Sequence, residues 1–573
     1  MINQFFRKKS VEQILAEVKA TEEGQNEHGL AKHLGLRDLV SFGVAAIIGA
    51  GIFATIGKAA YEGGPAIVYL FLFTAVGCVF SALCYAQFAS TVPISGSAYT
   101  YAYTAFGELI AWVLGWALVM EYAIGNIAVA ISWSEYFTQL LSGFGLNIPT
   151  HLSMDYLSAS RGYEQAVTDL ASGKTLTVSQ QAAYEAWQNA FQIGGFRLIA
   201  DLPALLITIA ITTLVYVGVK ESRNAGNIMV FIKMAVVIMV IVVGAFYVTP
   251  ANWSPFAPNG IDGILKSVSA VFFAYIGFDA ISTTAEECKN PQRDMPRAMI
   301  YSLLICTVLY VLIALVLTGM VHYSKMDVAD PLAMVFDEVG LSFLAGVISV
   351  SAVVAITSVF LVFQLGQPRI LMSMSRDGLL PSAFAKVHTK YKTPYISTIA
   401  TGFLVAIPAL FMNMTEVTDL TSIGTLFAFA MVSAGILRMP VPQAMRDGKK
   451  QFRVPYYNSR YFIPIIYFAF AALLAFQYTD ALQYFVSLDY TEEESSKMAL
   501  RWLFLALALY MGVMSVWRSW SLIPVLGVLV NVYLMTELNI SNWYGFGFWM
   551  IAGLVIYAGY GYKNSKLRQQ EAL

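Results

Sequence analysis

The sequence predicts an all-α integral membrane protein with about fourteen transmembrane helices. Of its 573 residues, 58% are hydrophobic and only 12% are charged, whereas about a quarter of the residues of a soluble globular protein carry a charge. The charged residues crowd into short segments, and the apolar runs between them approach the roughly 20 residues that cross a bilayer as a helix. These runs recur along nearly the whole chain, which excludes a soluble protein of several domains. The net charge of −1 leaves no basic surface for nucleic acid.

Taken in order, the apolar runs define the helices that we expect to cross the membrane. The third run is too long for a simple crossing, so we expect it to be tilted or to extend beyond the lipid. The polar segment 143–196 follows it and carries a helix-favouring stretch from Gln180 to Gln192. We expect this insert to lie outside the membrane as a cap, a docking surface or a tolerated insertion. The expected spans are 37–61, 65–91, 108–142, 198–219, 226–248, 263–284, 299–320, 340–363, 394–413, 417–437, 461–480, 499–517, 521–537 and 543–561.

Lysine and arginine residues predict the orientation of the spans, because cytoplasmic loops carry an excess of them. Arg7, Lys8 and Lys9 precede the first span, and the loops after the fourth, sixth, eighth and tenth spans and the C-terminal tail are also basic, whereas the loop 481–498 is acidic. An even number of spans places both basic ends of the chain in the cytoplasm. We expect the protein to lie in the cell (plasma or inner) membrane. The other basic residues on the predicted cytoplasmic side are Lys220, Arg223, Lys289, Arg293, Arg297, Arg369, Arg376, Lys386, Lys390, Lys392, Arg438, Arg446, Lys449, Lys450, Arg453, Arg460, Lys563, Lys566 and Arg568.

This topology divides the chain into four parts. We expect a cytoplasmic N-terminal segment at 1–35 and a ten-helix core at 36–438 that contains the extracellular insert 143–196. Additional transmembrane helices follow at 439–562, and a cytoplasmic tail occupies 563–573.

The first and sixth spans contain residues that suit an unbroken helix poorly. Gly49 and Gly51 flank Ala50 in the first span, and the sixth contains Gly277 and Asp279. Glycines in membrane helices often serve close packing, but an Asp within an apolar helix is costly unless it faces the protein interior. A five-plus-five inverted repeat makes these two spans equivalent, and transporters of that kind bind substrate between two broken helices. Exposed N–H groups there would receive a carboxylate, and freed carbonyls would receive an ammonium group.

Three ionisable residues lie deep within the predicted spans: Glu121, Lys233 and Asp279. A lysine at that depth must find a partner, be solvated or lose its proton, because burial disfavours its charged form. Lys233 is therefore either part of a static structural ion pair or a switch whose charge follows the transport state. The four cysteines and five histidines show no metal-ligand spacing, so we expect no metal site and no cofactor, and we expect the cysteines to be small buried hydrophobic residues.

Several ordered motifs resemble those of the amino acid–polyamine–organocation superfamily. Gly49-Ala50-Gly51-Ile52-Phe53 is similar to its Gly-x-Gly-Ile-Phe signature. Segments similar to its cationic amino acid transporter branch, whose bacterial members also include carriers of neutral amino acids, are Ser95-Gly96-Ser97-Ala98-Tyr99-Thr100-Tyr101, Phe273-Ala274-Tyr275-Ile276-Gly277-Phe278-Asp279, Glu286-Glu287 with Asn290-Pro291, and Arg376-Asp377-Gly378-Leu379. The resemblance covers about residues 30 to 565. It implies the leucine-transporter-type fold, with ten core helices in two inverted halves and further helices after them, whereas the insert 143–196 departs from the pattern.

The resemblance also implies roles for individual residues. Lys233 matches a lysine that takes the place of sodium in sodium-coupled relatives and is linked to proton coupling. Position 50 is often Thr or Ser in relatives, so Ala50 offers only its backbone N–H. The residues implied to bind substrate are Ile47, Gly49, Ala50 and Gly51 for the carboxylate, and Phe273, Ala274 and Ile276 for the amino group.

Four functions remain open on this fold. The first is proton-coupled symport of neutral or small aliphatic amino acids, because the expected wall of span eight near Ala355, Ile356 and Thr357 is apolar and small. The others are an amino acid exchanger in which Lys233 stays charged, a cationic amino acid carrier with Glu121 as acidic partner, and a sensor that binds without net flux. A channel is disfavoured because nothing resembles a selectivity filter, and an enzyme because no nucleophile–base set appears. The expected partners are an amino acid, protons and the lipid bilayer, and the sequence does not decide on an accessory subunit.

Overall fold

The computed structural model describes residues 7–9, 34–49, 51–92, 97–194, 196–218, 222–328, 330–391, 393–438, 452–477 and 492–572. Ala50, Lys220, the Ser95-Gly96 pair and the basic residues Lys392, Arg446, Lys449 and Lys450 lie outside the described residues. Helices make up nearly all of the described structure, as predicted, and its strands are two residues each within the insert.

The first half of the core begins with a span that is broken between α2 and α3. At this break, which contains glycine and other small residues, the chain forms a short π-helical turn, η2, in place of a regular α-helix. The third predicted run forms one continuous helix, α6, of 36 residues, which is about 54 Å long at 1.5 Å per residue. The elements are α2 (Leu36–Ile47), η2 (Gly51–Thr55), α3 (Ile56–Gly63), η3 (Gly64–Ala66), α4 (Ile67–Thr91), α5 (Ser97–Ala105), α6 (Glu108–Gly143), α9 (Leu202–Val217) and α10 (Ser222–Ala245).

The second half repeats the order of the first, beginning again with a broken span. Here α12 ends and a 3-10 helix, η6, continues after a left-handed residue, Gly277. The elements are η5 (Pro250–Trp253), α11 (Gly260–Lys266), α12 (Val268–Phe273), η6 (Phe278–Glu287), α13 (Pro291–Met320), η7 (Tyr323–Lys325), α14 (Pro331–Glu338), α15 (Ser342–Arg376), η8 (Ser382–Ala385), α16 (Tyr395–Ala409) and α17 (Met414–Arg438).

Equivalent helices of the two halves pack against each other. Helix α2 contacts η6, α4 packs along α13, α6 along α15, and α9 along α16. Pairing of the first, second, third and fourth spans with their counterparts is what two inverted halves around a shared centre produce. The buried apolar side chains between them form one continuous core.

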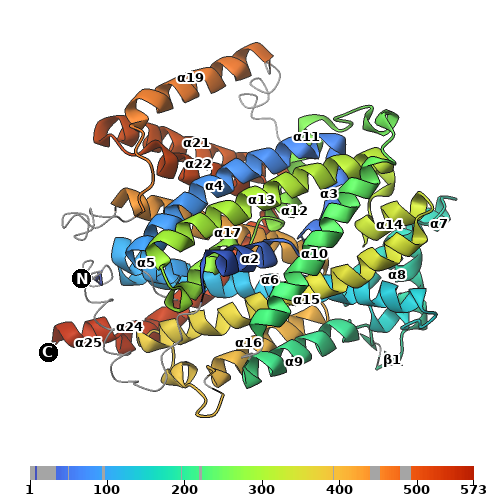
Figure 1. The fold of residues 1–573 in the computed structure, drawn as a ribbon, viewed down its shortest axis with the longest axis horizontal. Coiled ribbons are helices and arrows are strands. Elements are labelled where there is room, and N and C mark those ends of the chain that lie inside the picture. Colours follow the sequence, from blue (N-terminus) through green and yellow to red (C-terminus); the bar gives the residue numbers. More distant parts are fainter. Residues whose placement is uncertain are drawn as a thin grey trace.

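Further helices follow the core, and three of them, α19, α21 and α22, lie along one side of it. In Figure 1 the orange and red helices α19, α21 and α22 stand beside the blue α4, and α22 packs against both α17 and α4. These elements are α19 (Ser459–Gln477), α21 (Glu492–Arg518), α22 (Leu522–Thr536), α23 (Ile540–Ile556), η9 (Tyr557–Gly561), α24 (Tyr562–Asn564) and α25 (Lys566–Ala572).

By length and composition, eight helices of the described chain could cross a membrane, or up to nine if a bent pair counts as one span. The bent pair is Leu522–Thr536 with Ile540–Gln569, and two shorter apolar helices, α9 and α16, fall below that length. The count is lower than the predicted number of about fourteen because it takes the first two predicted spans as one stretch, Leu36–Thr91, and leaves out the shorter α9 and α16 and the two helices of the bent pair. The predicted number of spans therefore remains a prediction.

The insert forms a small helical subdomain at the end of the molecule opposite α5 and α25 (Figure 1). The predicted helix from Gln180 to Gln192 is present as α8 (Val178–Asn189), and a second helix that we did not predict, α7 (Tyr156–Ala171), packs against it. Its sequence signal was the N-cap, because the Asp155 side chain accepts a hydrogen bond from the backbone N–H of Ser158. The remaining elements are η4 (Thr150–Leu152) and the antiparallel pair β1 (Gln192–Ile193) and β2 (Phe196–Arg197).

The opposite end of the bundle, which the positive charges predict to be cytoplasmic, joins both terminal segments to the core. The Lys9 ammonium lies 2.7 Å from Oδ1 of Asp377, directly after α15, and the Tyr99 hydroxyl donates to Oδ2 at 2.6 Å. Glu108, fully buried at the start of α6, accepts hydrogen bonds from the hydroxyls of Tyr557 (2.9 Å) and Ser565 (2.5 Å). The N-terminal segment and the C-terminal helices thus close this face together.

Candidate functional site

The two broken spans meet in the middle of the core through their backbones. A Cβ added at Gly51 would overlap the Cα of Ala274, and one added at Gly277 would lie 2.8 Å from the carbonyl carbon of Ala46. Gly277 also has a φ of +119°, which residues with a side chain rarely adopt. Glycine at these two positions therefore allows direct contact between the broken helices.

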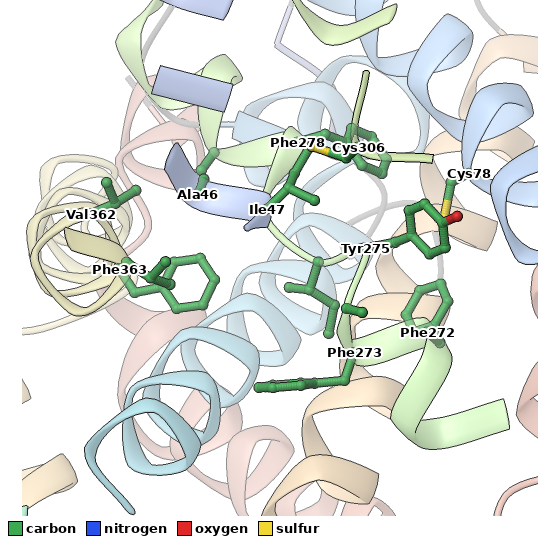
Figure 2. Packing of buried hydrophobic residues seen from close by; sticks show 14 of the residues in the cluster. Ala46, Ile47, Cys78, Phe272, Phe273, Tyr275, Phe278, Cys306, Val362 and Phe363 are labelled. Atoms are coloured by element: carbon green, nitrogen blue, oxygen red, sulfur yellow. The ribbon is translucent and has the colours of Figure 1, made fainter. Parts of the chain in front are cut away.

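A small pocket lies where these two breaks meet. It measures about 10 Å³, about the smallest space that holds one water molecule. Figure 2 shows Ala46 and Ile47 between Phe363 and Val362 on α15 at one side and Phe272, Phe273 and Tyr275 at the other. An amino acid can enter only if the walls move apart. The lining residues are Ala46, Ile47, Gly49, Gly51, Val129, Phe273, Ile276, Val359 and Phe363.

Five of the residues predicted to bind substrate line this pocket, namely Ile47, Gly49, Gly51, Phe273 and Ile276. Ala274 lies beside them against Gly51, whereas Ala50 falls outside the described residues.

The predicted wall of α15 lies one turn away from the residues that line the pocket. Ile356 is fully buried, and the Thr357 hydroxyl accepts a hydrogen bond from the Trp133 indole at 2.8 Å. Neither residue lines the pocket, whereas Val359 and Phe363 of the same helix do. The helical spacing of three and four residues from Ile356 could have pointed to Val359 and Phe363.

The pocket offers polar contacts only through its backbone, because every lining residue is glycine or carries an apolar side chain. Neighbouring carbonyls of the first span are already engaged: the Tyr310 hydroxyl donates to the Ile47 carbonyl at 2.9 Å. On the other side of the break, the Tyr136 hydroxyl donates to the Phe53 carbonyl at 2.6 Å. Hydrogen bonds from side chains of other helices thus fix the backbone on both sides of the break.

Lys233 lies next to the break in the first span, and its side chain is fully buried. Its ammonium donates to the carbonyls of Ala45 (2.7 Å) and Ile48 (2.9 Å) and to the Ser358 hydroxyl on α15 (3.0 Å). Within the described chain, no carboxylate lies within ion-pair distance of it. The lysine therefore ties the first span to α15 through neutral oxygens.

Glu121 and Asp279 lie apart from the pocket. Both are buried, and the Tyr122 hydroxyl donates to Asp279 at 3.3 Å. The Oε2 atom of Glu121 has no hydrogen-bond partner among the described residues. Glu121 lies two turns along α6 from Val129, which does line the pocket, so it does not contribute to the pocket wall in this structure.

A much larger cavity of about 1080 Å³ opens beside the pocket toward the insert. We call it the vestibule. Ala270 of α12 borders the vestibule one helical turn before Phe273, which lines the pocket. The walls come from η2, α3, α6, α11, α12, α17, α21, the segment between α22 and α23, and the insert, and include Thr55, Lys58, Ser179, Thr418 and Arg501.

The described residues include no group of three or more His, Cys, Asp or Glu side chains that could hold a metal ion. The four cysteines are free and buried, in agreement with the prediction that they are small buried hydrophobic residues.

Comparisons with known proteins agree with this architecture. A family model described as amino acid permease matches residues 34–507, and a model of the C-terminus of that family matches residues 522–565. The chain is 39% identical to a branched-chain amino acid permease of Bacillus subtilis over 79% of this chain and 89% of the relative. It is 40% identical to a methylthioribose transporter of Bacillus subtilis over 81% of this chain and 90% of the relative. It is 31% identical to cationic amino acid transporter 3, mitochondrial, of Arabidopsis thaliana over 94% of this chain and 92% of the relative.

Proposed function

This chain belongs to the amino acid permease family, a family of membrane transporters rather than enzymes, and we propose that it carries neutral, small or aliphatic amino acids together with protons. Transport would proceed by alternating access, in which the pocket between the broken spans opens first to one side of the membrane and then to the other. We further propose that the membrane is the plasma or inner membrane and that both termini are cytoplasmic. The basic residues at both ends of the chain support this orientation.

The proposal rests on the pocket between the two broken spans, which is bounded by backbone groups and by apolar side chains. Backbone groups at helix breaks can bind the carboxylate and ammonium groups that all amino acids share. The side chain of the substrate would meet Val129, Val359 and Phe363, none of which can pair with a charged group. A cationic or anionic side chain would lose its hydration there without compensation.

The names of the relatives leave two other substrate classes to compare. The methylthioribose transporter and the branched-chain amino acid permease are about equally similar to this chain, so identity alone does not select a substrate. Methylthioribose has neither a carboxylate nor an ammonium group, and the backbone contacts proposed here would be lost on it. A cationic amino acid would need an acidic partner, and Glu121, the candidate for that role, is not among the residues that line the pocket.

We expect alanine, valine and leucine to stabilise the purified protein against heat, and arginine and methylthioribose to do so at least tenfold less effectively. The amide and the amino alcohol made from alanine should fail as well, because each lacks the carboxylate. The measurement is the shift of Tm in detergent over a concentration series of each compound. A larger shift with arginine than with leucine would overturn the neutral substrate class, and a larger shift with methylthioribose would overturn amino acid transport.

The side chains that line the pocket lead to a separate prediction. Phe363→Ala should enlarge the pocket and raise the affinity for phenylalanine relative to alanine by roughly tenfold, since one methylene group already changes discrimination by that order. Val362→Ala is the matched control, because Val362 is the neighbouring residue on α15 and does not line the pocket. Competition of each amino acid with radiolabelled alanine measures the effect. An unchanged ratio in Phe363→Ala would mean that this ring does not contact the substrate side chain.

We also propose that transport is coupled to protons, and the contacts of Lys233 support this coupling. Charged, the ammonium holds the first span to α15; neutral, it loses most of that attraction and leaves the first span freer to move. An exchanger would keep Lys233 charged throughout, and a sensor would bind amino acids without flux. Uptake into proteoliposomes with and without an imposed proton gradient separates these three functions.

A further inference from the structure

Helix α2 ends at the break of the first span, and side chains of other helices bind the carbonyls at that end. The last four carbonyls of a helix have no N–H partner within it. Lys233 of α10 donates to the carbonyls of Ala45 (2.7 Å) and Ile48 (2.9 Å). The Tyr310 hydroxyl of α13 donates to the Ile47 carbonyl at 2.9 Å, and no other described residue donates to this carbonyl.

The Ile47 carbonyl is the acceptor that an unbroken helix would offer to Gly51, because each carbonyl of an α-helix binds the N–H four residues later. That bond is absent from the described structure, since Ile48 adopts an extended backbone (φ −76°, ψ 101°) and ends the helix. Gly49 and Gly51 are buried and line the pocket, and their N–H groups donate to no described residue. Buried N–H groups without a partner are rare in proteins, so these two suit a ligand that accepts hydrogen bonds.

The Tyr310 ring is held in place independently of its hydroxyl. The side chain is fully buried, and its ring packs against those of Phe71 of α4 (5.8 Å between centroids) and Tyr275 (5.4 Å). Tyr275 lies at the break of the sixth span (Figure 2), and its hydroxyl donates to the Phe71 carbonyl at 3.0 Å. The ring of Tyr310 thus packs against the second broken span while its hydroxyl binds the first.

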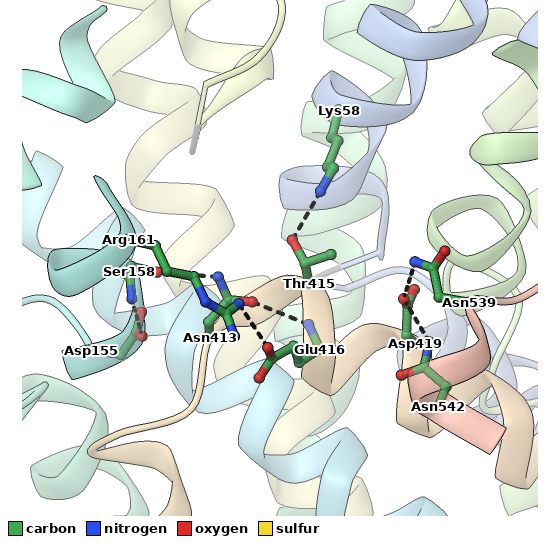
Figure 3. Close-up of polar contacts among 10 residues, drawn as sticks. All are labelled: Lys58, Asp155, Ser158, Arg161, Asn413, Thr415, Glu416, Asp419, Asn539 and Asn542. Atoms are coloured by element: carbon green, nitrogen blue, oxygen red, sulfur yellow. Dashed lines mark hydrogen bonds and ion pairs between the residues drawn. The ribbon is translucent and has the colours of Figure 1, made fainter. Parts of the chain in front are cut away.

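The outer half of the first span, η2 with α3, is held by other contacts. The Tyr136 hydroxyl of α6 donates to the Phe53 carbonyl at 2.6 Å. The Lys58 ammonium of α3 donates to the Thr415 hydroxyl of α17 at 2.9 Å (Figure 3). Loss of the Tyr310 hydroxyl therefore acts on the inner side of the break and leaves these contacts in place.

From this arrangement we propose that Tyr310 is a positioning residue, which keeps the Gly51 N–H free for the substrate carboxylate by occupying the Ile47 carbonyl. A buried carbonyl that loses its donor is costly. Without the hydroxyl, the Ile47 carbonyl therefore takes the next donor along the chain, the Gly51 N–H, and the substrate must break that bond before its carboxylate can bind. The inference rests on the proposed amino acid transport, which supplies the carboxylate.

Tyr310→Phe tests the proposal, because it removes the hydroxyl and keeps the ring. Equilibrium binding of radiolabelled alanine in detergent should show a Kd raised about fivefold, since one hydrogen bond changes an equilibrium by about that factor. Without substrate, the Gly51 amide should exchange its hydrogen at least threefold more slowly than in the wild type, because a hydrogen bond now protects it. Mass spectrometry of the peptides that contain Gly51 measures this exchange.

The direction of the change in exchange separates positioning from a general loss of structure, because a loosened core exchanges its amides faster. Tyr467→Phe is the matched control. It removes a hydroxyl bond of the same kind, to the Ala508 carbonyl at 2.6 Å, in the helices that follow the core, and both measurements should stay at the wild-type value. Tyr310→Met also lacks a donor and should reproduce both changes.

An unchanged Kd in Tyr310→Phe, or exchange at Gly51 that is unchanged or faster, would overturn the proposal. A Kd that rises equally in Tyr467→Phe would do the same, since the effect would then not depend on the break. If the wild type binds no amino acid, the proposed transport function fails, while the exchange measured without substrate still decides whether Tyr310 keeps the Gly51 N–H free.

Discussion

Replacing Lys233 by alanine is expected to abolish the part of amino acid uptake that a proton gradient drives. The ammonium donates three hydrogen bonds, two of them to carbonyls at the break of the first span, and hydrogen bonds to a charged group contribute about 1.5–3 kcal/mol each. A lysine that releases its proton toward one side of the membrane and regains it from the other would make and break this attachment once per cycle. Without the amine, the first span moves independently of protons.

We expect gradient-driven uptake by Lys233→Ala proteoliposomes to fall at least tenfold, to the level seen without a gradient. Binding of alanine in detergent should fall less, because Lys233 does not line the pocket. Lys233→Met provides a second variant that keeps the length of the side chain, and Lys266→Ala, in an exposed pair with Asp262, controls for loss of a lysine elsewhere. Wild-type stimulation by the gradient in Lys233→Ala would remove this residue from coupling and favour the exchanger.

Replacing Gly51 by leucine should abolish substrate binding while the protein still inserts into the membrane. A Cβ at this position would overlap the backbone of Ala274, and the larger side chain would fill the pocket of about 10 Å³. The substrate carboxylate needs close access to the backbone at this break, which only a residue without a side chain allows.

Gly346→Leu is the matched control, since a Cβ at Gly346 meets no atom within 4 Å. Alanine and leucine should raise the Tm of the wild type and of Gly346→Leu but not that of Gly51→Leu, measured at equal concentrations. Stabilisation of Gly51→Leu by alanine at the wild-type concentration would exclude binding at this break. If Gly51→Leu fails to insert, Gly51→Ala offers a smaller side chain for the same measurement.

The breaks in the first and sixth spans were predictable because glycine and Asp are costly within an apolar helix. Gly51, Gly277 and Asp279 stand out against their neighbours for this reason. Lys233 was recognisable on the same ground, as a charge in a segment that otherwise could face lipid. Polar or flexible exceptions in an apolar run carry information that the apolar residues themselves do not.

The side-chain wall of the pocket could not be predicted in the same way. Val129, Val359 and Phe363 line the pocket, but the lipid-facing and protein-facing sides of a membrane helix are both apolar, so hydrophobic periodicity does not distinguish them. For this reason the sequence pointed to Ile356 and Thr357, one turn away from the two α15 residues that line the pocket in this structure, and a contact of Ile356 or Thr357 with substrate remains a prediction. Helix α7 was missed because its apolar face is narrow and its strongest signal is the cap at Asp155.

Asp377 contacts both the N-terminal and the C-terminal segment of the protein, the first through its carboxylate and the second through its backbone carbonyl. Its side chain pairs with Lys9, and its carbonyl accepts the backbone N–H of Lys566 at 3.2 Å. Any displacement of Asp377 therefore disturbs both chain ends at the same time. Fluorophores attached near Lys9 and Lys566 would report the opening of this face as a change in energy transfer. For the same reason, affinity tags joined closely to either segment would disturb the closed state, and a long flexible linker is the safer design.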